Sequence, residues 1–140
     1  MTKYLLVEDT PELRNRVANE LRRPPKGAEI FVASSGVDAL KTLKNEPDID
    51  LVVLDLTLEG QMYGMEVLGK IRKTMDVPVV ILTTEQDPAR QVEALGRGAD
   101  GYMVKSIGFE SSPIQIRRYV ETVLEKHRSQ ASNVSGHLEK

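Results

Sequence analysis

Apolar and polar positions divide this chain into two kinds of segment. Short apolar runs at residues 4–7, 29–33, 51–54, 77–82 and 102–104 are typical of buried strands. Between these runs, apolar residues recur at three- and four-residue spacing, as Leu13, Val17 and Leu21 do, which predicts amphipathic helices. The pattern therefore predicts five strands that alternate with five helices.

Prolines and turn residues mark where the helices begin and end. Pro11, Pro88 and Pro113 each stand at a predicted first helical position, where a missing backbone N–H is tolerated. The fourth predicted helix carries Val92 and Leu95 as its apolar residues, and the fifth carries Ile116, Val120 and Val123 at helical spacing. From about Ser129 the composition turns polar, which favours a disordered tail over residues 128–140 behind a single domain at 1–127.

Regular alternation of strands and helices predicts an α/β fold, a doubly wound five-stranded parallel sheet with helices on both faces and right-handed crossovers. We expect the flavodoxin-like strand order 2-1-3-4-5, which is taken over from that group of folds. In that order the topological switch point lies between the first and third strands. Ligand sites of open α/β sheets lie at this point, beyond the carboxyl ends of the strands.

Composition excludes several classes of protein. The 140 residues carry a net charge of -2 and no cysteine, which excludes a disulfide framework, thiolate metal sites and a cysteine nucleophile. Such a small charge does not favour binding to nucleic acid or an anionic membrane. No stretch approaches the roughly 18 apolar residues of a membrane span, and no basic leader precedes the first strand, so a cytoplasmic location is expected.

Polar residues whose side chains can take part in a reaction stand at the carboxyl ends of the predicted strands. They are Glu8, Asp9, Asp55, Thr83 and Lys105. An aspartate after a strand is, by itself, more often a cap or turn residue than a nucleophile. Because parallel strands end at one edge of the sheet, however, all five side chains are expected to lie near one another.

This combination of groups favours phosphoryl transfer. Clustered carboxylates repel one another, and a divalent cation such as Mg²⁺ relieves the conflict while bridging to phosphate oxygens. Lys105 supplies a second positive charge and Thr83 a hydroxyl donor. With Asp55 as the nucleophile, the site is predicted to be a metal-assisted phosphoacceptor in which positioning and charge neutralisation supply the catalysis.

The same residues fall in motifs that resemble the receiver domain of two-component response regulators, the CheY-like superfamily. The matching segments are Val7-Glu8-Asp9, Leu54-Asp55, Leu82-Thr83 and residues 98–105, within a resemblance that covers roughly residues 3–127. The resemblance implies that Asp55 accepts a phosphoryl group from a histidine kinase or a histidine phosphotransfer protein. It implies a phosphorelay module that catalyses only its own phosphorylation and dephosphorylation, not an enzyme acting on other substrates.

Further roles follow from the resemblance alone. Asp9 and Asp55 would ligate Mg²⁺, Glu8 would assist through water, and the backbone carbonyl of Thr57 would complete the protein ligands. Tyr102 stands at the position of the switch aromatic, three residues before Lys105, the lysine of the motif. Coupled to Thr83, it would turn inward on phosphorylation and remodel the face formed by the fourth helix, fifth strand and fifth helix, a two-state element biased by local charge.

Three departures from the family pattern affect kinetics and output. Ser106 replaces the usual proline, so a trans peptide bond and a differently routed loop are expected there. The loop at residues 59–63 is one residue longer than usual and has Glu59 where proline is common. Thr84 replaces a small residue and is expected to narrow the approach to Asp55.

Three other functions are alternatives to this one. A flavin or nucleotide site needs a small Gly/Ser/Thr-rich loop after the first strand, but two acids stand there. A phosphatase of the haloacid dehalogenase type needs a second aspartate where this chain has Thr57. The more serious alternative is a receiver-like interaction or dimerisation domain that works without phosphorylation, which Ser106 and Thr84 make plausible.

Partners are less well defined by the sequence. Four arginines make the first helix basic, and in this family that helix can meet the kinase or phosphotransfer partner: Arg14, Arg16, Arg22 and Arg23. No DNA-binding helix-turn-helix is visible, so direct nucleic acid binding is not expected, and the downstream protein target is unknown. A monomer or weak homodimer is expected. Met62, Tyr63, His127 and His137 are interpreted as ordinary structural or surface residues.

Overall fold

The computed structural model describes residues 1–24, 27–58, 63–105 and 113–138. Its strands are β1 (Lys3–Val7), β2 (Glu29–Ala33), β3 (Leu51–Leu54), β4 (Val79–Thr83) and β5 (Gly101–Val104). Its helices are α1 (Pro11–Leu21), α2 (Gly36–Asn45), α3 (Gly64–Thr74), α4 (Pro88–Gly96) and α5 (Pro113–Leu138). The predicted alternation of strands and helices is confirmed. The expected effects of Ser106 and Glu59 concern residues outside those described.

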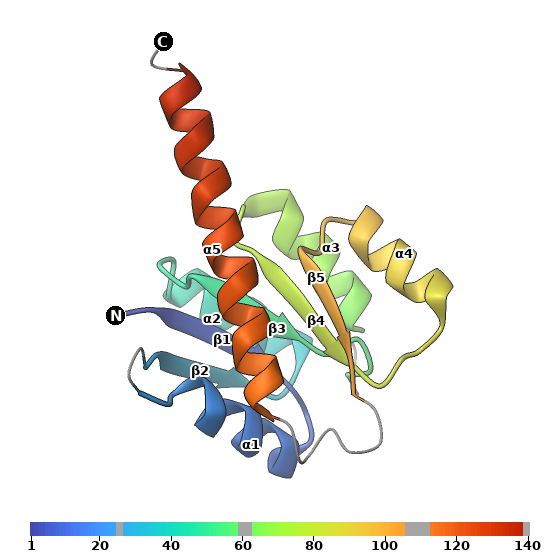
Figure 1. Cartoon of the computed structure of the whole chain (residues 1–140). Coiled ribbons are helices and arrows are strands. Elements are labelled where there is room, and N and C mark those ends of the chain that lie inside the picture. The colour runs from blue at the N-terminus through green and yellow to red at the C-terminus, as the bar shows by residue number, and fades with distance from the viewer. Residues whose placement is uncertain (25–26, 59–62, 106–112, 139–140) are drawn as a thin grey trace.

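All strand pairs are parallel, and the sheet order is β2-β1-β3-β4-β5, so the predicted topology is also confirmed (Figure 1). The register aligns the carboxyl ends of neighbouring strands: Val7 lies opposite Leu54, and Thr83 lies opposite Val104. The residues that follow these positions therefore meet at one edge of the sheet.

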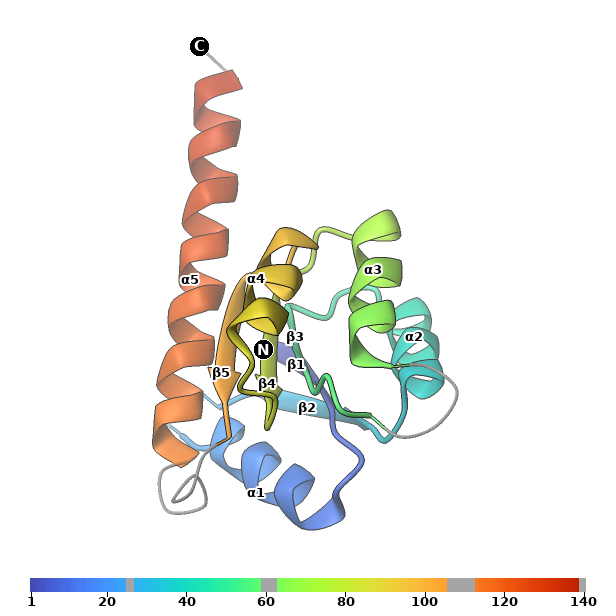
Figure 2. The same cartoon turned by 90° about the vertical axis from the view of Figure 1, so that its right-hand side faces the viewer.

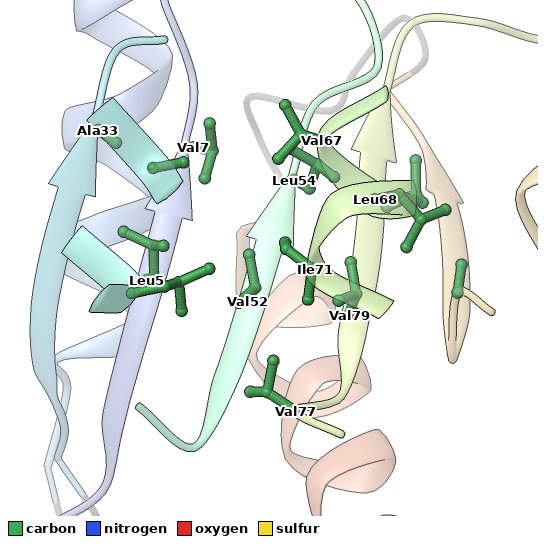
Figure 3. Close-up of a cluster of buried hydrophobic side chains, with 14 of the residues drawn as sticks. Leu5, Val7, Ala33, Val52, Leu54, Val67, Leu68, Ile71, Val77 and Val79 are labelled. Atoms are coloured by element: carbon green, nitrogen blue, oxygen red, sulfur yellow. The ribbon is translucent and has the colours of Figure 1, made fainter. Parts of the chain in front are cut away.

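Helices cover both faces of the sheet because every strand interior is apolar on both sides. Leu5 and Val7 point to the face covered by α2 and α3, where they join a cluster with Val67 and Leu68 (Figure 3). The intervening Leu6 belongs to a second cluster, with residues of α1 and α5. Figure 2 shows the two helix layers on opposite sides of the strands.

Local signals explain most of the helix starts. The Ser35 hydroxyl accepts a hydrogen bond from the backbone N–H of Asp38 at 3.1 Å, and the Asp87 carboxylate accepts one from Ala89 at 2.9 Å. Both contacts satisfy amides that have no partner within the helix. Proline at the first position of α1 and α4 needs no such partner.

Two details differ from the sequence-based picture. The apolar residues of α4 face solvent, since Val92 is 70% and Leu95 44% exposed, while the small Ala94 is the buried residue of this helix. The helix α5 runs to Leu138, through the segment for which a disordered tail was expected from residue 128, and its last turns project beyond the sheet (Figures 1 and 2). The division at residue 127 itself stays a prediction. Across the residues that the structure describes, no helix is sufficiently long and apolar to span a membrane.

One arginine joins three elements at the opposite edge of the sheet. Arg72 of α3 donates from Nε to the carbonyl of Gly98 at 2.8 Å and from Nη1 to the carbonyl of Val77 at 2.6 Å. Its Nη2 contacts Asp100 Oδ2 at 2.6 Å. Gly98 has φ +106°, and a Cβ there would lie 2.9 Å from the Arg72 side chain. The arginine thus fixes the chain before β4 and the turn before β5 against α3.

Candidate phosphoryl-transfer site

The predicted site residues occupy the carboxyl edge of the sheet. Glu8 follows β1, Asp55 follows β3, Thr83 ends β4 and Lys105 follows β5. All four are buried, with exposed fractions of 3%, 3%, 0% and 9% respectively. Buried charges are rare unless they are paired, so these side chains are expected to contact one another, and three of them do.

Asp55 is held at both carboxylate oxygens. Its Oδ1 accepts hydrogen bonds from the Thr57 backbone N–H and from the Thr57 hydroxyl, each at 2.9 Å. Its Oδ2 accepts one from Lys105 Nζ at 3.0 Å. The Asp55 amide itself donates to the carbonyl of Val7 at 3.1 Å, which continues the β1–β3 ladder up to the site.

Lys105 is shared between two acids. Besides Asp55, its ammonium group forms a close, buried ion pair with Glu8 Oε1. The other carboxylate oxygen of Glu8 accepts a hydrogen bond from the Thr10 amide at 3.3 Å. One lysine that follows β5 therefore neutralises part of the charge of the acids that follow β1 and β3.

The two acids respond to this environment in opposite directions. Burial raises the pKa of Glu8 to about 7, and the negative charge of Asp55 adds to this effect against the opposing influence of Lys105. Burial also acts to raise the pKa of Asp55, but the Thr57 amide and Lys105 outweigh it and hold that pKa below its usual value. Asp55 is thus ionised at neutral pH, as a nucleophile must be, whereas Glu8 still carries a proton in part of the molecules.

A third acid completes a group suited to a cation. Oxygen atoms of Glu8, Asp9 and Asp55 all lie within 4.8 Å of one another. Asp9 is half-buried at the start of the turn between β1 and α1. Carboxylate oxygens are the ligands that hard divalent cations prefer, so the residues present fit a bound divalent metal ion.

Sequence reasoning missed Gly64, the first residue of α3. A Cβ at Gly64 would lie 2.3 Å from the carbonyl oxygen of Asp55 and 2.5 Å from Leu56 Cα, closer than any side chain permits. Only glycine lets the start of α3 approach the backbone of the nucleophile so closely. The signal available in the sequence is a glycine just before an amphipathic run.

Sequence reasoning also assigned Thr57 only a backbone carbonyl. The structure shows that its amide and hydroxyl both contact Asp55. An aspartate carboxylate often accepts a hydrogen bond from the backbone amide two residues further on, and that tendency was the available signal.

Thr83 and Tyr102 are connected through the loop after β4. The Glu85 amide donates to the Thr83 hydroxyl at 3.3 Å, and the Tyr102 hydroxyl donates to the Glu85 carbonyl at 2.9 Å. Burial is the first cause of a raised pKa for Tyr102, which keeps that hydroxyl protonated as a donor. Thr84, next to Thr83, is exposed, and its expected effect on access to Asp55 stays a prediction.

The parallel α/β sheet carries three acids and a lysine beyond the carboxyl ends of its strands, an arrangement typical of signalling modules that are regulated at an acidic site. The sequence profile of the response regulator receiver domain matches residues 4–131, and the chain belongs to this family. It is therefore a receiver domain of a two-component regulator, a signalling module rather than an enzyme in the usual sense. Receiver domains have histidine kinases as partners, and the acidic group at Glu8, Asp9 and Asp55 is consistent with a phosphorylation site.

Named relatives agree with this assignment. The transcriptional regulatory protein KdpE of Mycobacterium tuberculosis is 33% identical over 120 residues, which cover 86% of this chain and 51% of KdpE. A CheY-like receiver domain protein from Methanospirillum hungatei shares the fold with a TM-score of 0.80 at 21% identity, over 93% of this chain and 98% of that one. The Mn²⁺-bound form of the response regulator Rcp1 has a TM-score of 0.77 at 27% identity, over 87% of this chain and 96% of that one. The chain spans about half the length of the curated relatives it matches.

Proposed function

We propose that Asp55 accepts a phosphoryl group from a phosphohistidine of a histidine kinase or histidine phosphotransfer protein. The observation that carries this proposal is the buried Asp55 carboxylate, with one oxygen on Thr57 and the other on Lys105, beside the carboxylates of Glu8 and Asp9. In the transfer, an Asp55 oxygen forms a bond to phosphorus while the phosphorus–nitrogen bond breaks. The imidazole leaves with that electron pair and takes up a proton.

The surrounding residues stabilise the charge that this reaction moves. Lys105 already contacts Asp55 Oδ2 and is placed to follow negative charge onto the phosphoryl oxygens. The Thr83 hydroxyl offers a donor at the end of the neighbouring strand β4. Fixed groups of this kind need no reorganisation during the reaction, which is how phosphoryl-transfer sites achieve most of their effect.

The proposed cofactor is Mg²⁺, held by Asp9, Asp55 and the Thr57 carbonyl with Glu8 acting through water. When bound, such an ion neutralises phosphoryl oxygens and aligns them with the nucleophile. The Mn²⁺-bound structure of Rcp1 supports a divalent ion in a receiver of this type.

We propose that the output is a change of the α4–β5–α5 face, through Thr83 and Tyr102. The exposed Val92 and Leu95 on α4 support this, because apolar residues presented to solvent favour docking of a partner protein. Arg16 of α1 and Arg22 directly after it support an encounter with an acidic kinase or phosphotransfer surface, since both side chains are exposed.

Incubation with Mg²⁺ and acetyl phosphate tests the proposal. Intact-mass spectrometry should show one added phosphoryl group that is stable in acid and labile in base. Asp55→Asn should show none, EDTA should suppress the gain, and Asp48→Asn, which changes an aspartate whose side chain is 61% exposed, should react like the wild type. An unmodified wild type, or equal modification of Asp55→Asn, would refute the phosphoacceptor role and favour an interaction domain that works without phosphorylation.

A further inference from the structure

Tyr119 of α5 contacts the outer edge of the sheet. Among the residues that the structure describes, β5 is the last strand of the sheet, so alternate backbone groups along it face no neighbouring strand. The Lys105 amide donates to the Thr83 carbonyl of β4 at 2.7 Å, whereas the Tyr102 amide, on the other edge, donates to the Tyr119 hydroxyl at 3.0 Å. A side chain of α5 therefore takes the place of a missing strand at Tyr102.

The contact is built closely. A Cβ at Gly101 would lie 2.6 Å from the Tyr119 hydroxyl oxygen and 3.0 Å from two carbons of its ring. The ring can rest on β5 only because the residue before Tyr102 is glycine. The geometry is thus specified from both sides, by a tyrosine on α5 and a glycine on β5.

Tyr102 consequently holds two hydrogen bonds that lead in different directions. Its side-chain hydroxyl donates to the carbonyl of Glu85, whose amide donates to Thr83 at the site. Its backbone amide donates to Tyr119 on α5. One residue of β5 is therefore bonded both to the loop beside the site and to the helix on the edge of the sheet.

A second attachment of α5 runs elsewhere. Arg117 Nε lies 3.1 Å from Glu20 Oε1, and Glu20 of α1 is 5% exposed. This ion pair ties α5 to α1 without touching β5. The two anchors can therefore be separated by mutation.

We propose that Tyr119 is a positioning residue that couples α5 to the state of Asp55, by passing a rearrangement of Tyr102 to the helix. The inference rests on the proposed function and deepens it, because it makes α5 and its projecting last turns the element that responds. Movement of the Thr83–Glu85 loop shifts the bonding partner of the Tyr102 hydroxyl. The backbone of Tyr102 then moves against Tyr119, and the helix follows.

Residue-resolved amide hydrogen exchange on the full chain tests the coupling, with and without Mg²⁺ and beryllofluoride, a stable analogue of the phosphoryl group. In the wild type, the analogue should change exchange at Tyr102 and along α5. Tyr119→Phe should exchange roughly five-fold faster at the Tyr102 amide, as loss of one neutral hydrogen bond implies, and its α5 amides should lose most of their response. Its phosphorylation by acetyl phosphate should stay at the wild-type level, since Tyr119 does not contact the site.

Control variants separate coupling from simple loosening of the helix. Arg117→Gln weakens the attachment of α5 to α1 and should raise α5 exchange equally with and without the analogue, leaving the response intact. Tyr63→Phe removes a hydroxyl from a residue that is 67% exposed and should change nothing. If Tyr119→Phe keeps the full α5 response, or merely raises α5 exchange equally in both states, the coupling role is refuted.

A double-mutant cycle keeps the inference testable if Asp55 itself proves unreactive. Tyr102→Phe removes the hydroxyl that contacts Glu85 but keeps the backbone amide that contacts Tyr119. Without any analogue, the effects of Tyr102→Phe and Tyr119→Phe on α5 exchange should be non-additive by at least about two-fold if the two contacts are coupled. Additive effects would overturn the inference, whereas failure of the proposed function shows instead as an unmodified Asp55.

Discussion

Glu8→Gln should change how the stability of the metal-free protein depends on pH. Burial, reinforced by the charge of Asp55, raises the pKa of Glu8 from 4.5 to about 7. The folded chain therefore keeps a proton on Glu8 over a range in which the unfolded chain has released it. This proton increases the free energy of unfolding, and its contribution is complete below about pH 4.5. The contribution is lost as the pH rises through 7.

The difference between those two pKa values corresponds to about 3 kcal/mol. Glutamine is neutral in both the folded and the unfolded state and keeps an oxygen for the Thr10 amide. The free energy of unfolding of the variant therefore does not fall in this way as the pH rises. The free energy of unfolding of Glu8→Gln, relative to the wild type, should rise by about 3 kcal/mol between pH 4 and pH 8. Asp55 contributes in the opposite direction and at lower pH. Because its pKa is lowered in the folded state, the ionised carboxylate adds to stability above about pH 3.8, and this contribution is lost on further acidification.

Urea unfolding in EDTA, followed by circular dichroism, measures this difference across the pH range. Glu125→Gln changes an exposed glutamate of α5 and should show no such trend. Saturating Mg²⁺ favours the ionised carboxylate and should shrink the difference at pH 8. A difference between Glu8→Gln and the wild type that stays constant within about 1 kcal/mol would refute the assignment of the raised pKa to Glu8.

Three other substitutions probe the frame around the site. Gly64→Ala should lower the free energy of unfolding by about 1–3 kcal/mol, because a Cβ would clash with the Asp55 backbone; unchanged urea unfolding would contradict the close approach. Thr57→Val removes one of two hydrogen bonds to Asp55 Oδ1, so the Asp55 pKa should rise toward its usual value in a carbon-detected NMR titration, and an unchanged pKa would count against the contact. Arg72→Ala should cost about 2–4 kcal/mol in urea unfolding because backbone carbonyls lose a charged donor, whereas Arg90→Ala, which breaks an exposed ion pair, should cost at most about 1 kcal/mol; equal costs would argue against the role of Arg72.

The sheet could be predicted from the sequence because its signals are local. Four apolar residues in a row before Asp55, repeated in kind before Thr83, mark buried strands without any knowledge of their neighbours. Strand order came from a known group of folds, and it placed Glu8 beside Asp55 correctly. The meeting of the site residues thus followed from topology, since each residue alone has a more ordinary explanation.

Contacts that depend on packing between distant elements could not be predicted. Leu95 looks like a core residue of α4, but the small Ala94 fits against the sheet and turns Leu95 outward. Glu20 reads as a solvent residue of α1, yet α5 covers it and Arg117 pairs with it. The contact of Tyr119 with β5 is a third example, because it depends on a glycine, Gly101, on another element.

The sharing of Lys105 between Glu8 and Asp55 sets the charge that the site offers to a cation. With Glu8 ionised as well, three carboxylates and one ammonium group would leave two negative charges, which is the charge that one divalent ion neutralises. A monovalent ion would leave one negative charge on the site, and a trivalent ion would leave one positive charge. In a metal-loaded site, Lys105 would therefore favour a divalent ion over a monovalent or trivalent one on charge alone.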